Sequence, residues 1–334
     1  MNEIATERVS LVYDTFGNPN DPTIVLIMGL NTQMTGWPNS FCQDIADAGY
    51  HIVRFDNRDV GHSKKFDELG SPNLGYMLLM RKLGLRPSAP YDLDDMALDV
   101  IDLLDELHID SAHVIGISMG GMIAQNVTAN HPHRIRSLTS IMSSTGSPKL
   151  PGTDPKVIKH FVHNRSKPNS VEDQLKYSME TWDIIGSPDY PVPDDEKREE
   201  LIRDMERSDY TDGFARHLGA IIASGDRTEL LRTIKQPTMV IHGMDDPLVP
   251  IEHGLATAKA IPNASFKTIK GMGHDLPKEL RKPIAKMILK HIDKAEQYPL
   301  SKMLATDKYN PDHNKEHESS RWLPSLLGVF GFTS

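Results

Sequence analysis

Short apolar runs alternate with longer amphipathic stretches along most of the chain. This alternation is typical of β-α-β units and of a largely parallel sheet that helices cover on both faces. The run Thr-Ile-Val-Leu-Ile-Met at 23–28 is almost continuously apolar, which predicts a central strand buried on both faces. The predicted strands are 9–16, 23–28, 51–55, 113–117, 138–142, 238–241 and 265–269.

Apolar residues spaced three and four positions apart predict helices between these strands. In the first of them, Met96, Val100 and Leu104 share one face. Strands and helices in this order predict an α/β protein with a mostly parallel, doubly wound sheet. The predicted helices that pack on this sheet are 94–107, 119–129 and 280–292.

Residues 145–230 have a different character, because no apolar strand run interrupts them. They are densely charged and predict several helices, including 171–185 and 194–207. Structureless loops of this length are rare in compact domains, so we expect a helical cap over the carboxyl ends of the strands rather than a surface excursion. The expected parts are core 1–144, cap 145–230, core 231–296 and a C-terminal extension, 297–334.

The C-terminal extension is mainly polar but ends in an apolar stretch. Leu323, Leu326, Leu327 and Phe330 fall at helical spacing and form an apolar stripe. A frayed tail is the ordinary interpretation of such a segment. We expect it instead to dock on its own chain or on a second copy, which would make a homo-oligomer.

Composition and charge narrow the functional classes. The net charge of −9, without dense Lys/Arg clusters, argues against nucleic-acid binding. Cys42 is the only cysteine, so no intramolecular disulfide and no cysteine zinc site can form, which fits a reducing compartment. The chain start predicts no signal peptide, and its apolar runs are too short to span a bilayer. The expected location is the cytoplasm.

The sequence Gly-Ile-Ser-Met-Gly at 116–120 lies where a predicted strand ends and a predicted helix begins. A sharp strand–turn–helix elbow exposes a serine hydroxyl for attack, and it needs flanking glycines because a Cβ there would collide with its neighbours. The alternative is a glycine-rich turn with a capping serine. The strand and helix on either side favour Ser118 as a nucleophile.

A nucleophilic serine of this fold needs an acid and then a histidine further along the chain. Asp246 follows strand 238–241 and precedes a proline, and His274 lies in a glycine-flanked loop after strand 265–269. The sequence therefore predicts that His274 is the general base and that Asp246 orients it, with Asp245 as the alternative acid. An ordinary turn aspartate and a surface histidine are the competing interpretations.

The oxyanion of the tetrahedral intermediate requires two backbone N–H donors. We expect one from Met119, which follows the nucleophile, and the other from Leu30, in the loop after strand 23–28. No cofactor and no metal ligand enters this chemistry.

Several motifs resemble the α/β-hydrolase superfamily, in the serine esterase branch that contains aclacinomycin methylesterase. They are Ile-Met-Gly-Leu-Asn at 27–31, Gly-Trp-Pro at 36–38, Arg-Phe-Asp-Asn-Arg-Asp-Val-Gly-His-Ser at 54–63, Ala-Pro-Tyr-Asp-Leu-Asp-Asp-Met-Ala at 89–97 and Gly-Met-Gly-His at 271–274. The resemblance implies a cofactor-free Ser–His–Asp hydrolase that cleaves a small-molecule ester. The apolar segment 75–83 is expected to line the acyl pocket or to pack in the core.

Other reactions use the same serine elbow. Hydrolysis of C–C bonds in vinylogous diketones, opening of enol-lactones, cofactor-free perhydrolysis and thioester cleavage stay open alternatives, as does a slow-turnover ligand sensor. Haloalkane dehalogenases and epoxide hydrolases of this fold have an aspartate at the elbow, so Ser118 argues against both activities. The sequence predicts a carboxylic ester or lactone hydrolase.

Overall fold

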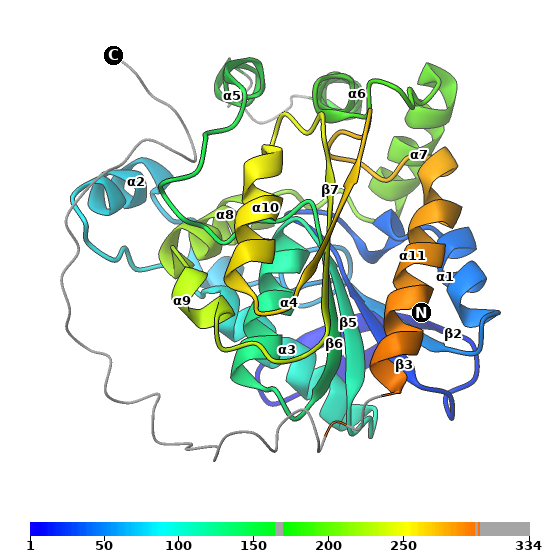
Figure 1. Ribbon diagram of the computed structural model, residues 1–334. Helices are drawn as coiled ribbons and strands as arrows, with labels where there is room; N and C mark the ends of the chain where they lie inside the picture. Colours follow the sequence, from blue (N-terminus) through cyan, green and yellow to red (C-terminus); the bar gives the residue numbers. More distant parts are fainter. Residues whose placement is uncertain (164–169, 298–299, 301–334) are drawn as a thin grey trace.

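The computed structural model describes residues 1–163, 170–297 and 300, and these form one sheet with helices on both of its faces (Figure 1). The strands are β1 (Asn2–Ala5), β2 (Ser10–Phe16), β3 (Thr23–Ile27), β4 (His51–Phe55), β5 (Ala112–Ile117), β6 (Ile135–Ile141), β7 (Thr238–Gly243) and β8 (Ser265–Ile269). They lie in the order β1-β2-β4-β3-β5-β6-β7-β8. β1 and β2 pair antiparallel, as do β2 and β4, and every other neighbouring pair is parallel.

The helices fall into two groups, those outside the connection from β6 to β7 and those within it. The first group is α1 (Asn39–Ala46), α2 (Leu74–Lys82), α3 (Leu93–Glu106), α4 (Met119–Asn130), α10 (Ile251–Ala260) and α11 (Lys278–Glu296), with the short 3-10 helices η1 (Met34–Gly36) and η2 (Asp67–Leu69). The second group is α5 (Pro155–His163), α6 (Val171–Ile185), α7 (Asp194–Arg207), α8 (Gly213–Ser224) and α9 (Thr228–Leu231).

The central strand β3 divides the core into two layers. Its side chains alternate between the faces of the sheet, as strand geometry requires. Ile24 and Leu26 pack in the layer formed with α1 and α11, whereas Val25 and Ile27 pack in the layer formed with α3 and α4. All four are fully buried. This two-sided burial explains why 23–28 is apolar at successive positions.

The connections create a crevice at the carboxyl ends of the central strands. From β3 the chain crosses to β4 on one side and later returns to β5 on the other side of β3. Ligand sites of open α/β sheets lie at such a switch point, just beyond the strand ends. The loop that begins at Met28 and the elbow at Ser118 both lie there, because they directly follow β3 and β5.

The structure confirms the predicted fold class and refines several element bounds. α3 begins at Leu93, where Asp92 and Asp95 form a reciprocal capping box that satisfies free backbone N–H groups. β6 begins at Ile135, three residues before the predicted start. Strand β1 was not expected from the sequence, because it is a short edge strand whose residues are mostly exposed and lack an apolar pattern.

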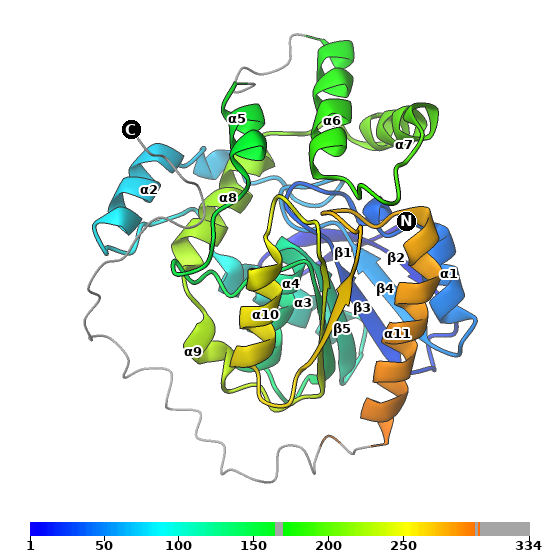
Figure 2. The same cartoon turned by 45° about the horizontal axis from the view of Figure 1, so that its top comes forward.

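Residues 145–230, hereafter the insertion, contain four of the five helices between β6 and β7 and all but the last residue of the fifth, α9. Figures 1 and 2 show α5, α6 and α7 above one end of the sheet. Hydrogen bonds join the insertion to loops that follow β3 and β8: Asn31 N donates to His217, and His274 N donates to the carbonyl of Ile185. The division at 144, 230 and 296, and the role of the insertion as a cap, stay predictions.

Segment 75–83 packs in the core only in part, and its place in an acyl pocket stays a prediction. It forms most of α2, and Tyr76, Leu79 and Leu83 are exposed, whereas only Met77 is buried, against Ile222 and Ala223 of α8. A helix that packs along one narrow face leaves its other apolar side chains in solvent.

The apolar stripe at 323–330 and nearly all of the extension 297–334 lie outside the described residues. Within the described part of the chain, none of the helices combines the length and the apolar character that a bilayer crossing requires.

Candidate active site

Ser118 occupies a strained turn between β5 and α4. Its backbone dihedrals are φ 55° and ψ −120°, a region that non-glycine residues rarely adopt and that costs on the order of 1–3 kcal/mol. Hydrogen bonds hold this conformation: Ser118 N donates to the carbonyl of Ile141 at 2.9 Å, and Ser143 Oγ donates to the carbonyl of Ser118 at 2.7 Å. The turn directs the hydroxyl of Ser118 out of the sheet.

The two glycines of the elbow are required by close backbone packing. A Cβ added to Gly116 would lie 2.1 Å from the carbonyl oxygen of Gly120. A Cβ added to Gly120 would lie 2.2 Å from the carbonyl oxygen of Ile27, at the end of β3. Any larger residue at either position would therefore push α4 away from the sheet and move the serine.

His274 connects Ser118 to Asp246. Its Nε2 lies 3.0 Å from Ser118 Oγ, and its Nδ1 lies 2.7 Å from Asp246 Oδ2. A carboxylate only accepts hydrogen bonds, so the proton of the neutral imidazole belongs on Nδ1, and Nε2 is left to accept from the serine hydroxyl. Asp246 and His274, 28 positions apart, thus form one continuous hydrogen-bonded chain with Ser118, which lies 156 positions before the histidine.

The carboxyl group of Asp246 is fixed from its other side. The side chain is fully buried, and Oδ1 accepts hydrogen bonds from the backbone N–H groups of Leu248 and Val249 at 3.0 and 2.8 Å. His242 is also buried, and its Nε2 lies 3.6 Å from Asp246 Oδ2. The same Nε2 donates a hydrogen bond to the carbonyl of Val249. These contacts orient Oδ2 toward the imidazole.

Asp245, the alternative acid, has a different role in the structure. It is exposed, and its Oδ2 accepts a hydrogen bond of 2.8 Å from the backbone N–H of Gly271. Its own backbone N–H donates to the carbonyl of Met272 at 3.1 Å. Asp245 therefore ties the acid loop to the histidine loop, and the carboxylate that contacts His274 belongs to Asp246.

The loop after β3 lies against the serine. A Cβ added to Gly29 would lie 3.3 Å from the Cβ of Ser118, so Gly29 lies against the elbow, and Leu30 is the next residue of the chain. Asn57 Nδ2 donates to the carbonyl of Met28 at 2.9 Å and holds the start of this loop. Met119 is the first residue of α4, and the N–H groups of a first helical turn have no intrahelical acceptor. Leu30 and Met119 stay the predicted oxyanion donors.

The sequence interpretation missed Asn57, and a signal for it existed. This buried residue stands two positions after β4, at the carboxyl end of a parallel strand, where polar side chains commonly face the ligand crevice. His217 and Ser187, in the insertion, also contact the loops of the site and were missed. Nothing in their local sequence distinguishes them from other polar residues of helices and turns.

Buried ion pairs join the insertion to the core beside this site. Arg216 of α8 makes a bidentate contact with Asp59 at 2.8 and 2.7 Å, and both side chains are almost completely buried. Burial acts to raise the pKa of Asp59, but hydrogen bonds from Arg216, from the backbone N–H of Phe66 and from Tyr91 hold this pKa below its ordinary value. The pair therefore stays charged.

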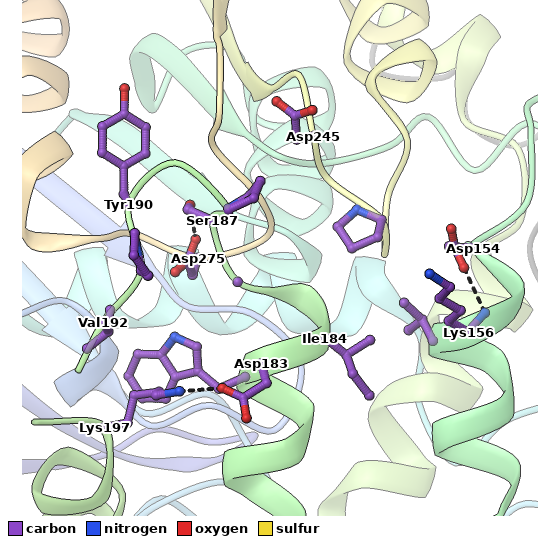
Figure 3. Close-up of a pocket in the computed structure, with 16 residues that line it drawn as sticks. Asp154, Lys156, Asp183, Ile184, Ser187, Tyr190, Val192, Lys197, Asp245 and Asp275 are labelled. Atoms are coloured by element: carbon purple, nitrogen blue, oxygen red, sulfur yellow. Dashed lines mark hydrogen bonds and ion pairs between the residues drawn. The ribbon is translucent and has the colours of Figure 1, made fainter. Parts of the chain in front are cut away.

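A cavity of about 370 Å³ lies between the insertion and the loops that carry the acid and the histidine (Figure 3). Asp245 and Asp275 line it from the core, and Trp182, Ser187 and Tyr190 line it from the insertion. Its described lining residues do not include Ser118, so the serine hydroxyl does not line this cavity. Among the described residues, we find no group of three or more His, Cys, Asp or Glu side chains arranged to hold a metal ion.

Comparisons with known proteins find similar hydrolases. Rhodomycin D methylesterase DauP of Streptomyces sp. (strain C5) is 27% identical over 306 residues, which cover 86% of this chain and 96% of that protein. A 2-hydroxy-6-oxononadienedioate/2-hydroxy-6-oxononatrienedioate hydrolase of Cupriavidus pinatubonensis is 27% identical over 80% of this chain and 85% of its own length.

The fold has equally clear counterparts among solved structures. The crystal structure of the enol-lactonase from Burkholderia xenovorans LB400 superposes with a TM-score of 0.64 at 23% identity and covers 87% of this chain and all of that one. The family model described as alpha/beta hydrolase fold matches residues 22–279, which is most of the chain. This protein therefore belongs to the α/β-hydrolase fold family.

Proposed function

We propose that this protein is a serine hydrolase that cleaves a small-molecule carboxylic ester or lactone through an acyl-enzyme on Ser118. The observation that carries the proposal is the hydrogen-bonded chain from Asp246 through His274 to Ser118. The similarity to DauP, a methylesterase by name, supports the ester as the substrate class.

The first half of the reaction forms the acyl-enzyme. Ser118 Oγ attacks the carbonyl carbon while His274 Nε2 takes the hydroxyl proton, and Asp246 stabilises the imidazolium. The oxyanion accepts hydrogen bonds from the backbone N–H groups of Met119 and Leu30, each worth about 3–4 kcal/mol in the transition state. Collapse of the intermediate breaks the bond to the alkoxy oxygen, and His274 returns the proton to the departing alcohol.

The second half releases the acid. A water molecule gives a proton to His274 and attacks the acyl carbon, and the second tetrahedral intermediate then expels Ser118 Oγ, which recovers the proton. The carboxylic acid leaves, and the hydrogen-bonded chain is restored. Every proton in this scheme passes through His274 Nε2, the atom that lies 3.0 Å from the serine oxygen.

The direct test uses the full chain with short p-nitrophenyl esters and a fluorophosphonate probe. The wild type is expected to hydrolyse the esters and to be labelled on Ser118, and Ser118→Ala is expected to lose both while its circular dichroism is unchanged. Labelling of another serine, or ester turnover that survives Ser118→Ala, would refute the proposal. Saturable ligand binding without turnover would instead favour a sensor of the same fold.

Hydrolysis of a C–C bond is the second candidate reaction. Its specific support is the 27% identity to the 2-hydroxy-6-oxononadienedioate/2-hydroxy-6-oxononatrienedioate hydrolase. Side-by-side assays of a methyl ester, an enol-lactone and a vinylogous diketone would rank the reactions by kcat/KM. A preference for the diketone would replace the ester assignment, and the residues of the hydrogen-bonded chain would keep their places.

We further propose that the insertion acts as a cap over the site. Support comes from the cavity between the insertion and the acid and histidine loops, and from the contacts of His217 and Ile185 with loops of the core. A ligand-bound structure in which no insertion residue touches the acyl or alcohol group would contradict this role.

A cytoplasmic location and self-association through 297–334 complete the proposal. Their support is the sequence alone: the single cysteine and the apolar stripe of the extension. Cell fractionation tests the location. Sedimentation of the full chain beside a variant with Leu326→Asp and Leu327→Asp tests association, and identical masses would refute it.

A further inference from the structure

The loop that carries His274 is held by the insertion as well as by the core. The backbone N–H of His274 donates to the carbonyl of Ile185 at 2.7 Å, and the N–H of Asp189 donates to the carbonyl of Gly271 at 3.2 Å. The fit is tight, since a Cβ added to Gly273 would lie 2.4 Å from the carbonyl oxygen of Gly186. Segment 185–189, which begins at the last residue of α6, therefore forms one wall of the histidine loop.

Ser187 lies at the centre of this wall and contacts both neighbours of the histidine. Its Oγ accepts a hydrogen bond of 2.9 Å from the backbone N–H of Gly273 and donates to the carboxylate of Asp275 (Figure 3). The side chain of Ser187 is buried, and its hydroxyl uses its one donor and one of its two acceptor lone pairs in these bonds. The hydroxyl thus brackets His274 from positions 273 and 275.

Asp275 is the acceptor of the hydrogen bond that Ser187 donates. Burial raises the pKa of its carboxyl group, and the hydrogen bond from Ser187 acts against that rise. A hydrogen bond to a charged acceptor is stronger than one between neutral groups. On its core side the same loop is held independently by Asp245, which accepts from Gly271 N. The loop can therefore keep its fold without Ser187 and still lose the alignment of its histidine.

We propose that Ser187 is a positioning residue that holds His274 in line between Ser118 and Asp246. The inference rests on the proposed function, because alignment matters only if His274 transfers protons. Displacement of a catalytic group by about 1 Å can cost about 100-fold in rate. The insertion then contributes to catalysis through the base itself and not only by covering the site.

The test compares four full-length variants by kcat and KM on a p-nitrophenyl ester. Ser187→Ala is expected to lower kcat at least about tenfold with KM changed less than about twofold, because the loss falls on proton transfer and not on binding. Ser187→Thr keeps the hydroxyl and is expected to recover most of kcat. Ser187→Cys keeps the size of serine but is a weak donor, so it is expected to behave like alanine. Ser178→Ala, on α6, is the matched control and is expected to match the wild type.

A second readout needs no turnover. The proton on His274 Nδ1, which bonds Asp246, is observed by NMR and assigned by its absence in His274→Gln. In Ser187→Ala and Ser187→Cys this signal is expected to weaken through faster exchange. If both variants keep the wild-type kcat and the wild-type signal, the positioning role is refuted. A wild type that shows the signal but hydrolyses no ester would refute the proposed function alone, and the change of signal in the variants would still decide the role of Ser187.

Discussion

His217 Nδ1 accepts a hydrogen bond of 3.1 Å from the backbone N–H of Asn31. His217 lies on α8 of the insertion, and Asn31 follows Leu30 in the loop beside Ser118. The other ring nitrogen, Nε2, donates to the carbonyl of Arg58 at 2.7 Å. One ring nitrogen accepts while the other donates, which only the neutral imidazole can do. Burial lowers the pKa of His217 to about 4, in agreement with the neutral form.

Two amide substitutions of His217 separate its contacts. The oxygen of Asn can take the place of Nδ1, whereas the amide nitrogen of Gln can take the place of Nε2. We expect His217→Gln to lower kcat about tenfold, because the N–H of Asn31 loses its acceptor and the loop that carries Leu30, the proposed oxyanion donor, shifts. His217→Asn is expected to keep a larger kcat. Equal values for the two variants, measured with the same ester, would show that the bond to Asn31 does not act on the site.

Asp246 and Asp245 form a matched pair for testing the acid. Asp246→Asn is expected to lower kcat by on the order of 10⁴-fold, since an amide can stabilise the wrong imidazole tautomer and cannot balance the imidazolium. Asp245→Asn keeps an oxygen for the N–H of Gly271, so its effect is expected to stay below about tenfold. Steady-state kinetics of both variants decide between them, and the reverse ranking would move the acid to position 245.

Stability is expected to fall as the pH drops from 6.5 toward 4. The ordinary pKa of a histidine is 6.5, and burial lowers the pKa of His217 and of His291 to about 4 in the folded protein. Between these values the unfolded chain binds protons that the folded protein does not, so acid favours unfolding. For His217 the loss is on the order of 3 kcal/mol in the free energy of unfolding.

Urea unfolding at pH 7 and at pH 4.5 measures this effect. Carboxylates also contribute to acid unfolding, so the variant His217→Asn provides the comparison. Its free energy of unfolding is expected to depend less steeply on pH than that of the wild type. Parallel curves for the two proteins would show that His217 takes up no proton on unfolding in this range.

The Arg216–Asp59 pair is expected to be essential for stability. Arg216→Met would leave the buried carboxylate of Asp59 without its guanidinium. Such a loss typically lowers the free energy of unfolding by about 3–5 kcal/mol. Arg216→Lys keeps the charge but not the two parallel hydrogen bonds, so its loss is expected to be smaller. Chemical denaturation measures the free energy of unfolding of both variants. If Arg216→Lys is as unstable as Arg216→Met, the two parallel hydrogen bonds of the guanidinium matter more to stability than its charge.

Local sequence patterns predicted the parts of this protein that depend on local physics. The continuous apolar run at β3 predicted a buried parallel strand, because only a strand covered on both faces excludes polar side chains. The glycines around Ser118 predicted a tight elbow, because a Cβ at Gly116 or Gly120 would meet backbone atoms. These features are encoded within a few residues and need no knowledge of distant partners.

The order of the elements along the chain also allowed the acid and the base to be predicted. Asp246 and His274 each follow a strand of the same parallel sheet, so their loops had to meet at one edge. The sequence alone gave no firm rule for choosing between Asp245 and Asp246 as the acid. Neighbouring residues of a turn point in different directions, and a small change in backbone angles decides which of the two side chains faces the histidine.

What the sequence by itself determined is the α/β-hydrolase class, the succession of strands and helices along the chain, and the residue types in the loops that follow the strands. Only the tertiary structure decided which carboxylate faces His274, and which residues of the insertion, Ser187 and His217, touch the reactive loops. The reason is physical: periodicity records whether a side chain faces the core or the solvent, whereas a hydrogen bond across 186 positions depends on how separate elements pack and leaves no local trace.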